Sequence, residues 1–233
     1  MLFMQNPLAR LLVLLDYDGT VTAHECNELV LQTLTGDAWR EPEAELHAGL
    51  IGHAECFSRQ VAMIDVPRAR LLEEAVRVAD LAPGFKEFLR ALHGAGARTA
   101  VVSAGFREAI EAVWNVNALP PVQIFASELI GERPPFRVAY NPALGDCPVC
   151  GTGTCKGALA RSLRRPGDVL TVFGDAHSDL CMAREADVIF ARGTLVRLCE
   201  REGLTCHRLH DFRDALAELR SELALRLPAG APT

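Results

Sequence analysis

The stretch Leu11–Thr20, LLVLLDYDGT, decides the fold of this chain. Its first half, Leu11–Leu15, is wholly apolar, which is typical of a parallel strand buried on both faces of a sheet. Asp16 and Asp18 follow that strand directly. In open α/β sheets, ligands bind beyond the carboxyl ends of the strands. The stretch therefore predicts a buried first strand with a functional site at its end.

Short apolar segments and helical segments alternate along the rest of the chain. This alternation predicts an α/β fold, a doubly wound parallel sheet covered by helices on both faces. Further strands are expected at Arg98–Ser103, Val122–Ala126, Val169–Phe173 and Asp187–Ala191.

Residues 24–80 break this alternation, because they contain helical patterns and no clear strand. We expect a small helical cap domain at residues 22–81, inserted after the first strand. Residues 1–21 and 82–233 would then form the core domain. The expected cap helices are Glu25–Leu34, Glu43–Leu50, Glu55–Ile64 and Arg68–Val78.

Composition excludes several classes of protein. The chain has 233 residues, and its 49% of hydrophobic residues excludes a disordered protein. Its net charge of −6 excludes non-specific electrostatic binding to nucleic acid or to anionic membranes. No apolar run near the start approaches the roughly 18 residues of a membrane span. The N-terminus lacks the small-residue cleavage site of a signal peptide. We expect a cytoplasmic protein, a monomer or homodimer, that binds neither nucleic acid nor membranes.

Three expected strands deliver aspartates and a serine to one edge of the sheet. Asp16 and Asp18 follow the first strand, Ser103 ends the second, and Asp175 and Asp179 follow Val169–Phe173. A single aspartate in such a place is well explained as the cap of a helix or turn. Several together repel one another by roughly 4 kcal/mol per pair at 4 Å and an effective dielectric of 20. Hard oxygen ligands of this kind indicate a Mg²⁺ site.

A phosphate cradle is expected beside these carboxylates. Ser103 offers its hydroxyl, and the amides of Ala104 and Gly105 are expected to open a helix N-terminus, which favours anions. Lys156 begins another expected helix. It is one of only two lysines in the chain, the other being Lys86, so its positive charge is a candidate partner for phosphate.

Four motifs in order carry a resemblance to a known family. DYDGT at 16–20, VVSAG at 101–105, Lys156 before a helix and GDAHSD at 174–179 resemble the haloacid dehalogenase superfamily. The resemblance implies a Rossmann-type core with a helical cap and hydrolysis of a small phosphomonoester with one Mg²⁺ per active site. It implies that Asp16 is the nucleophile that forms an aspartyl-phosphate, that Asp18 is the general acid and base, and that Ser103 and Lys156 hold the phosphate.

The same resemblance assigns the metal and substrate residues. Asp16, the backbone carbonyl of Asp18 and Asp175 are the implied Mg²⁺ ligands, with Asp179 as a ligand or directly behind one. The substrate-binding residues that we expect are Gly19, Thr20, Glu25, Arg59, Ala104 and Gly105.

Two subgroups of the superfamily are similar to this chain. A helical cap after the first motif resembles the phosphoserine phosphatases, and Glu25 lies where those enzymes place a substrate-sensing acid. Their carboxylate-binding arginine is replaced by Ser58, with Arg59 next to it. The cysteine-rich loop before Lys156 is similar to that of the methionine-salvage phosphatases that act on 2-hydroxy-3-keto-5-methylthiopentenyl 1-phosphate. Phosphoserine phosphatase, phosphomutase and dehalogenase remain alternatives.

The cysteine-rich loop has a chemistry of its own. Cys147, Cys150 and Cys155 have the spacing of a zinc knuckle, so a structural Zn²⁺ is one interpretation. Reduced structural thiols and a redox-responsive pair are the others, and a regulatory metal-binding module centred on this loop is the alternative to an enzyme. The fourth zinc ligand would come from Asp146, Cys181, Cys206 or His207, while Cys26, Cys56, Cys181 and Cys199 also suit small core positions.

Overall fold

The computed structural model describes residues 7–140, 147 and 150–226. Short helical turns occur at η1 (Pro7–Arg10), η2 (Tyr17–Val21) and η4 (His177–Asp179). The strands are β1 (Leu11–Leu15), β2 (Arg98–Phe106), β3 (Gln123–Ile130), β4 (Arg137–Ala139), β5 (Val169–Gly174), β6 (Val188–Ala191) and β7 (His207–Arg208). The helices are α1 (Cys26–Thr35), α2 (Arg40–His47), α3 (His53–Ala62), α4 (Arg68–Val78), α5 (Phe85–Gly94), α6 (Arg107–Val116), α7 (Lys156–Leu163), α8 (Leu180–Ala183), α9 (Gly193–Glu202) and α10 (Phe212–Arg226).

The described strands form one seven-stranded sheet in the order β4-β3-β2-β1-β5-β6-β7. Every neighbouring pair is parallel except β3 and β4, which are antiparallel. Strand order runs outward from β1 in both directions, which places β1 at the switch point where α/β sheets bind ligands. The predicted doubly wound parallel sheet is confirmed.

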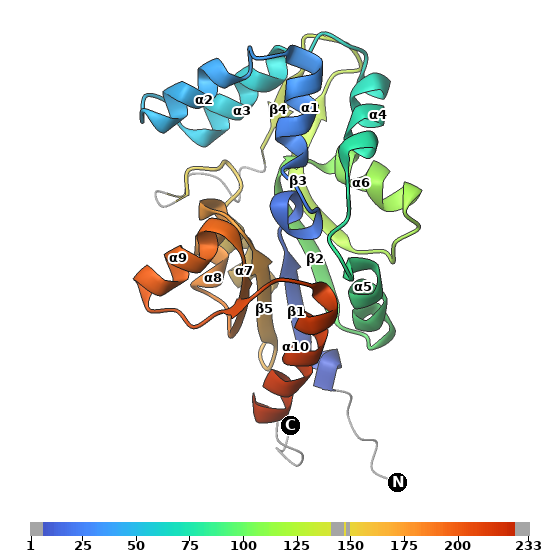
Figure 1. Ribbon diagram of the computed structural model, residues 1–233, viewed down its shortest axis with the longest axis vertical. Helices are drawn as coiled ribbons and strands as arrows, with labels where there is room; N and C mark the ends of the chain where they lie inside the picture. Colours follow the sequence, from blue (N-terminus) through green and yellow to red (C-terminus); the bar gives the residue numbers. More distant parts are fainter. Residues whose placement is uncertain (1–6, 141–146, 148–149, 227–233) are drawn as a thin grey trace.

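Strand β1 shows why the fold has two helical layers. Its side chains alternate between the two faces of the sheet. Leu11, Val13 and Leu15 pack into the core cluster that includes residues of α5, α6 and α10. Leu12 and Leu14 pack into the cluster that includes residues of α7, α8 and α9. An entirely apolar strand therefore contributes to both cores, and Figure 1 shows β1 between these layers.

The four helices α1–α4 lie between β1 and β2 in the chain, as the sequence predicts. Figure 1 shows α1, α2 and α3 beyond one end of the central strands, whereas α4 lies alongside α6. Leu31, Trp39 and Val61 of this helical region share a core cluster with Leu129 of β3 and with Phe136. The helices are therefore anchored on the β3–β4 hairpin as well as on one another.

The two segments that connect the helices α1–α4 to the sheet run side by side. Thr22 pairs with Leu81, the amide of Ala23 donates to Asp80, and the amide of Ala82 donates to Val21. This pairing lies where we expected the boundaries of the cap. The division into a core domain and a cap domain at 22 and 81 stays a prediction.

Several element boundaries differ from the expectations. Strand β2 extends past Ser103 to Phe106, and α2 begins at Arg40 and ends at His47 rather than at Leu50. After β5, the 3₁₀ turn η4 leads directly into the short helix α8, so the helical stretch that follows this strand consists of two short pieces.

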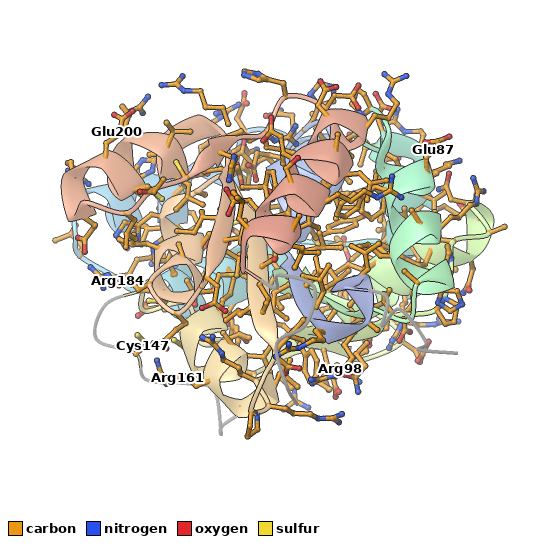
Figure 2. All side chains as sticks on the ribbon, turned by 90° about the horizontal axis from the view of Figure 1, so that it is seen from below. Glu87, Arg98, Cys147, Arg161, Arg184 and Glu200 are labelled. Carbon is orange, nitrogen blue, oxygen red and sulfur yellow. The ribbon has the colours of Figure 1, made fainter. Side chains whose placement is uncertain are left out.

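No described helix has the length and hydropathy of a membrane span. Charged side chains instead project from the outer faces of the helices. Figure 2 shows this for Glu87 on α5, Arg184 after α8 and Glu200 on α9, all three of which are exposed.

Candidate active site

Asp16 lies at the carboxyl end of β1, where the chain turns sharply into η2. It is buried, and its amide donates to the carbonyl of Phe173 on the neighbouring strand β5. The turn depends on Gly19, whose φ is +68°. A Cβ atom at Gly19 would lie 2.5 Å from Oδ2 of Asp175, so glycine allows the first motif to approach the fourth.

Lys156, the first residue of α7, joins the motifs through its ammonium group. Its Nζ donates to Oδ1 of Asp16 and to Oδ1 of Asp179, the latter at 2.5 Å. The side chain is only 2% exposed. Burial alone lowers the pKa of a lysine, but here Asp16 and Asp179 outweigh it and the pKa of Lys156 is raised. The lysine is therefore held in its charged form.

The carboxylates of the first and fourth motifs converge, as the strand-end argument predicts. Oxygen atoms of Asp16, Asp175 and Asp179 all lie within 4.8 Å of one another. Burial and the charge of Asp179 raise the pKa of Asp16 well above its usual value and that of Asp175 to about 7. The other oxygen of Asp179 accepts from the amides of Asp175 and Ala176 at 2.9 and 3.0 Å, which fixes its orientation.

This donor set fits Mg²⁺. The converging groups are all hard carboxylate oxygens, and their negative charge exceeds what one lysine neutralises. Burial raises the pKa of Asp16 and Asp175 most, and the neighbouring carboxylates raise it further. A divalent cation removes that repulsion.

Asp18 is held by Asn27, a residue that the sequence analysis did not identify. The amide of Asn27 donates to Oδ1 of Asp18 at 3.2 Å, and its Nδ2 donates to Oδ2 at 2.6 Å. Burial, followed by the charge of Asp16, raises the pKa of Asp18 to about 7. Asn27 lies in the first turn of α1, and no local sequence signal marks it as a partner of Asp18.

Arg192 is the second residue that sequence reasoning missed. Its guanidinium donates to the backbone carbonyls of Gly19, Thr20 and Thr22, the last two at 3.1 and 2.6 Å. Arg192 follows β6 directly, so the strand-end rule that found Asp16 would have found it. It holds the turn that carries Asp16 and Asp18.

The expected phosphate cradle is partly wrong. Ala104 and Gly105 do not open a helix, because β2 continues to Phe106 and α6 begins one residue later. The pairing of β2 with β3 shifts register between Val102 and Phe106. Ser103 is buried, and its Oγ accepts from the amide of Gly105 at 3.0 Å. A Cβ atom at Gly105 would lie 2.7 Å from Nδ2 of Asn27, so this extended segment packs against the Asp18 partner.

The remaining expected substrate residues lie at different depths. Thr20 is fully buried, and its hydroxyl donates to Oδ1 of Asp175 at 3.3 Å. Glu25 lies beside Gly19 and Asp175, and burial and Asp18 raise its pKa to about 7. Arg59 does not line the cavity described below. Instead it forms a bidentate ion pair with Glu45 of α2, with N–O distances of 2.6 and 2.9 Å.

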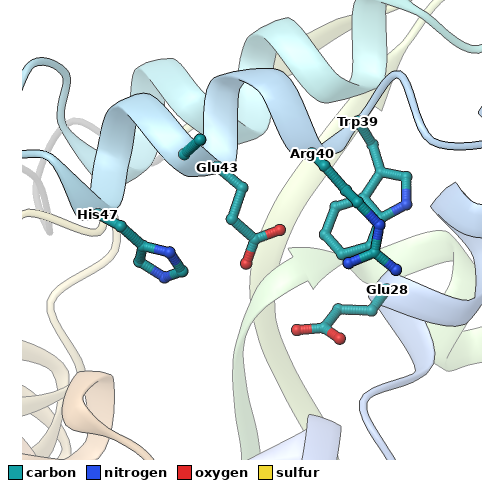
Figure 3. Close-up of a pocket in the computed structure, with 6 residues that line it drawn as sticks. Glu28, Trp39, Arg40, Glu43 and His47 are labelled. Atoms are coloured by element: carbon teal, nitrogen blue, oxygen red, sulfur yellow. The ribbon is translucent and has the colours of Figure 1, made fainter.

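A cavity of about 320 Å³ lies between the helical region, the end of β2 at Ala104 and the loop after β5. Figure 3 shows an adjoining pocket of about 270 Å³ under α2, where Glu43, His47 and Glu28 face one another and Arg40 stacks on Trp39. No lysine or arginine is among the described residues that line the larger cavity, and Arg59 is absent from them. They are Glu25, Asn27, Glu28, Leu31, Trp39, Glu43, Leu46, His47, His53, Cys56, Phe57, Gln60, Ala104, Tyr140, Thr152, Ala176, His177 and Ser178.

Comparisons with known proteins agree with this arrangement. A 2-hydroxy-3-keto-5-methylthiopentenyl-1-phosphate phosphatase of an Exiguobacterium species is 28% identical over 214 residues, covering 89% of this chain and 96% of the relative. The phosphatase of the same name from Geobacillus kaustophilus is 26% identical over 215 residues, covering 91% and 96%.

Solved structures share the fold. A phospho-aspartyl intermediate analogue of phosphoserine phosphatase superposes with a TM-score of 0.66 at 19% identity, covering 90% of this chain and 98% of that one. A probable phosphoserine phosphatase from Vibrio cholerae gives 0.70 at 20% identity, covering 97% and 70%.

The solved structures agree with the expected fold, and the two relatives support the expected enzyme class, a phosphoric monoester hydrolase. The sequence model of the haloacid dehalogenase-like hydrolases matches residues 13–184, which include every one of those motifs and most of the chain. This chain therefore belongs to the haloacid dehalogenase-like hydrolase family.

Proposed function

We propose that this hydrolase releases phosphate from a small phosphorylated metabolite, with Mg²⁺ and through a phosphorylated Asp16. One observation carries the proposal: Lys156 is buried between Asp16 and Asp179, with Asp175 beside them. Three carboxylates and one lysine converging at the end of β1 suit a dianionic phosphate and a divalent cation together.

Asp16 is the proposed nucleophile. Lys156 donates to its carboxylate and favours the ionised form, which opposes the effect of burial. Bound Mg²⁺ would neutralise charge on the phosphate oxygens and on the carboxylates. An oxygen of Asp16 then attacks phosphorus, and the bond between phosphorus and the ester oxygen breaks.

Asp18 is the proposed proton carrier. With a pKa of about 7, it is available in both protonation states near neutral pH. In the first step it gives its proton to the departing ester oxygen. In the second step it takes a proton from the water that attacks the phosphorus of phosphorylated Asp16, so that inorganic phosphate leaves and both aspartates return to their starting states. Asn27 keeps the carboxyl of Asp18 in place throughout.

The cavity favours one class of substrate. Its apolar lining includes Leu31, Trp39 and Phe57, and no lysine or arginine lies among the described lining residues to bind a carboxylate. Arg40, in the adjoining pocket, is already stacked on Trp39 and donates to Gln32. These features support a phosphate ester with an uncharged, partly apolar remainder. The enol phosphate named for the relatives, 2-hydroxy-3-keto-5-methylthiopentenyl 1-phosphate, is such a compound.

Phosphate release decides between the candidate functions. The panel contains an enol phosphate mimic, phosphoserine, sugar phosphates and pyridoxal phosphate, each assayed in Mg²⁺-free buffer and after Mg²⁺ is added. We expect Mg²⁺-dependent release that is lost in Asp16→Asn and strongest for the enol phosphate. Preference for phosphoserine would instead support a phosphoserine phosphatase. Isomerised sugar phosphate without free phosphate would indicate a mutase and contradict the proposal.

A further inference from the structure

Four cysteines gather beside the active site. Sγ atoms of Cys147, Cys150, Cys155 and Cys181 all lie within 4.8 Å of one another. Three of them come from the loop before α7, and Cys181 comes from α8. Cys150, Cys155 and Cys181 are buried, and Cys147 is half-buried. Figure 2 shows Cys147 near Arg161 of α7.

The spacing of these sulfurs matches a metal centre. A tetrahedral site with Zn–S bonds of about 2.3 Å places its sulfurs about 3.8 Å apart. The Sγ atoms of Cys147 and Cys181 are 3.8 Å apart. A disulfide would bring two sulfurs to about 2.05 Å, whereas none of these four cysteines is in a disulfide. The amide of Ala158 also donates to Sγ of Cys155 at 3.4 Å, a contact that stabilises a thiolate.

We infer that Cys147, Cys150, Cys155 and Cys181 bind one structural Zn²⁺. Four soft thiolates in tetrahedral reach are the ligand set that Zn²⁺ takes in closed, non-catalytic sites. Cys181 supplies the fourth ligand that the sequence left open. His207 is engaged elsewhere, 3.2 Å from both Glu218 and Glu222, and Asp146 lies outside the described residues.

The zinc would tie together two parts of the chain that meet at the active site, the loop before α7 and helix α8. Cys155 immediately precedes Lys156, and Cys181 lies two residues after Asp179. Helices α7 and α8 approach so closely that a Cβ atom at Gly157 would lie 2.6 Å from the carbonyl oxygen of Cys181. A cross-link between Cys155 and Cys181 therefore holds the backbone on both sides of the Lys156–Asp179 contact.

The same loop reaches the helical region. A Cβ atom at Gly153 would lie 2.6 Å from the ring of Tyr140, and the Tyr140 hydroxyl donates to the carbonyl of Ala54 at 2.9 Å. Thr152 lines the cavity. The zinc site would therefore be structural, and the loop that carries three of its ligands also lines the cavity. The inference rests on the sulfur geometry and is independent of the proposed phosphatase activity.

Metal content tests the inference directly. Full-length protein is purified under reducing conditions without chelator, and its bound zinc is measured by inductively coupled plasma mass spectrometry. We expect about one Zn²⁺ per chain in the wild type and in Asp16→Asn, and loss of zinc in Cys147→Ser and Cys181→Ser. Cys206→Ser is the matched control, because Cys206 is half-buried like Cys147 but lies outside the cluster. It should retain its zinc.

Cobalt provides a readout that does not depend on the variants folding. Replacement of zinc by Co²⁺ in the wild type should produce the sulfur-to-cobalt charge-transfer absorption of a tetrahedral thiolate site. Zinc lost in Asp16→Asn but kept in Cys181→Ser would place the metal in the active site and overturn the inference. So would a folded wild type that contains no zinc, whether its cluster cysteines are free thiols or form a disulfide.

Discussion

Replacing Lys156 by methionine tests the electrostatics of the site, because it removes one charge and keeps a long side chain. Both Asp16 and Asp179 accept a hydrogen bond from Nζ, and carboxylate oxygens of the two residues lie within 4.8 Å of each other. Two unit charges at that distance repel by about 3.5 kcal/mol at an effective dielectric of 20. Breaking a buried ion pair from one side costs a similar amount, about 3–5 kcal/mol. We expect Lys156→Met to lose about 3–4 kcal/mol of unfolding free energy in Mg²⁺-free buffer.

Thermal and urea unfolding followed by circular dichroism measure this loss. For a domain of this size each kcal/mol shifts the melting temperature by about 2–4 °C, so we expect a drop of roughly 6–16 °C. The matched control is Lys86→Met. Lys86 is the other lysine of the chain, is half-buried on α5 and has no ion pair among the described residues. Its replacement should change the melting temperature little.

Mg²⁺ distinguishes electrostatics from packing. A cation bound to the same carboxylates replaces the missing positive charge, so Mg²⁺ should stabilise Lys156→Met more than the wild type. Stabilisation by a ligand reaches about 2.7 kcal/mol at one hundred times its dissociation constant. The reasoning is refuted if Lys156→Met melts like Lys86→Met, or if it is destabilised but Mg²⁺ raises both melting temperatures equally.

Asn27→Ala removes the 2.6 Å hydrogen bond to Asp18. One hydrogen bond to a charged group contributes about 1.5–3 kcal/mol. We therefore expect steady-state kinetics to show that kcat falls by about 10–100-fold while KM changes little. An unchanged kcat would show that Asp18 does not need this partner. Gly105→Ala places a Cβ atom 2.7 Å from Nδ2 of Asn27 and should also lower kcat. The control Gly94→Ala has no atom within 4 Å of its new Cβ and should leave kcat unchanged. Equal activity of the two variants would contradict the close packing of Gly105 against Asn27. Glu74 is buried, and hydrogen bonds from neighbouring arginine side chains lower its pKa from 4.5 to about 2. The ionised carboxylate therefore contributes fully to the free energy of unfolding above about pH 4.5, and this contribution disappears as the pH falls through 2. Urea unfolding of Glu74→Gln should therefore show a stability deficit at pH 7 that shrinks between pH 4 and pH 2, and a pH-independent deficit would rule out this origin.

The predictions that hold best concern residues whose position follows from their own neighbours. Leu11–Leu15 can only be a strand buried on two faces, and the residue after it must emerge at the sheet edge. The same logic applies to Asp175 after β5. Because parallel strands end at one edge, local patterns were enough to bring Asp16 and Asp175 together.

The predictions that failed depend on pairing between elements. Ala104 and Gly105 looked like the start of a helix, but the shifted register between β2 and β3 extends the strand to Phe106. Arg59 was expected at the substrate, yet the packing of α3 against α2 gives it Glu45 as a partner. A helical pattern shows which face of a helix is buried, and it does not show which neighbour covers that face.

The doubly wound core, the helices after the first strand and the meeting of Asp16, Asp175, Asp179 and Lys156 could be predicted from the sequence alone. These features follow from periodicity, which records burial, and from strand ends, which share one edge. Only the tertiary structure decided that Asn27 holds Asp18, that Arg192 holds the Gly19 carbonyl across 173 positions, and that Cys181 completes the cysteine cluster. Such partners meet because helices and loops pack in one particular arrangement, and packing between distant segments leaves no periodic signal in the chain.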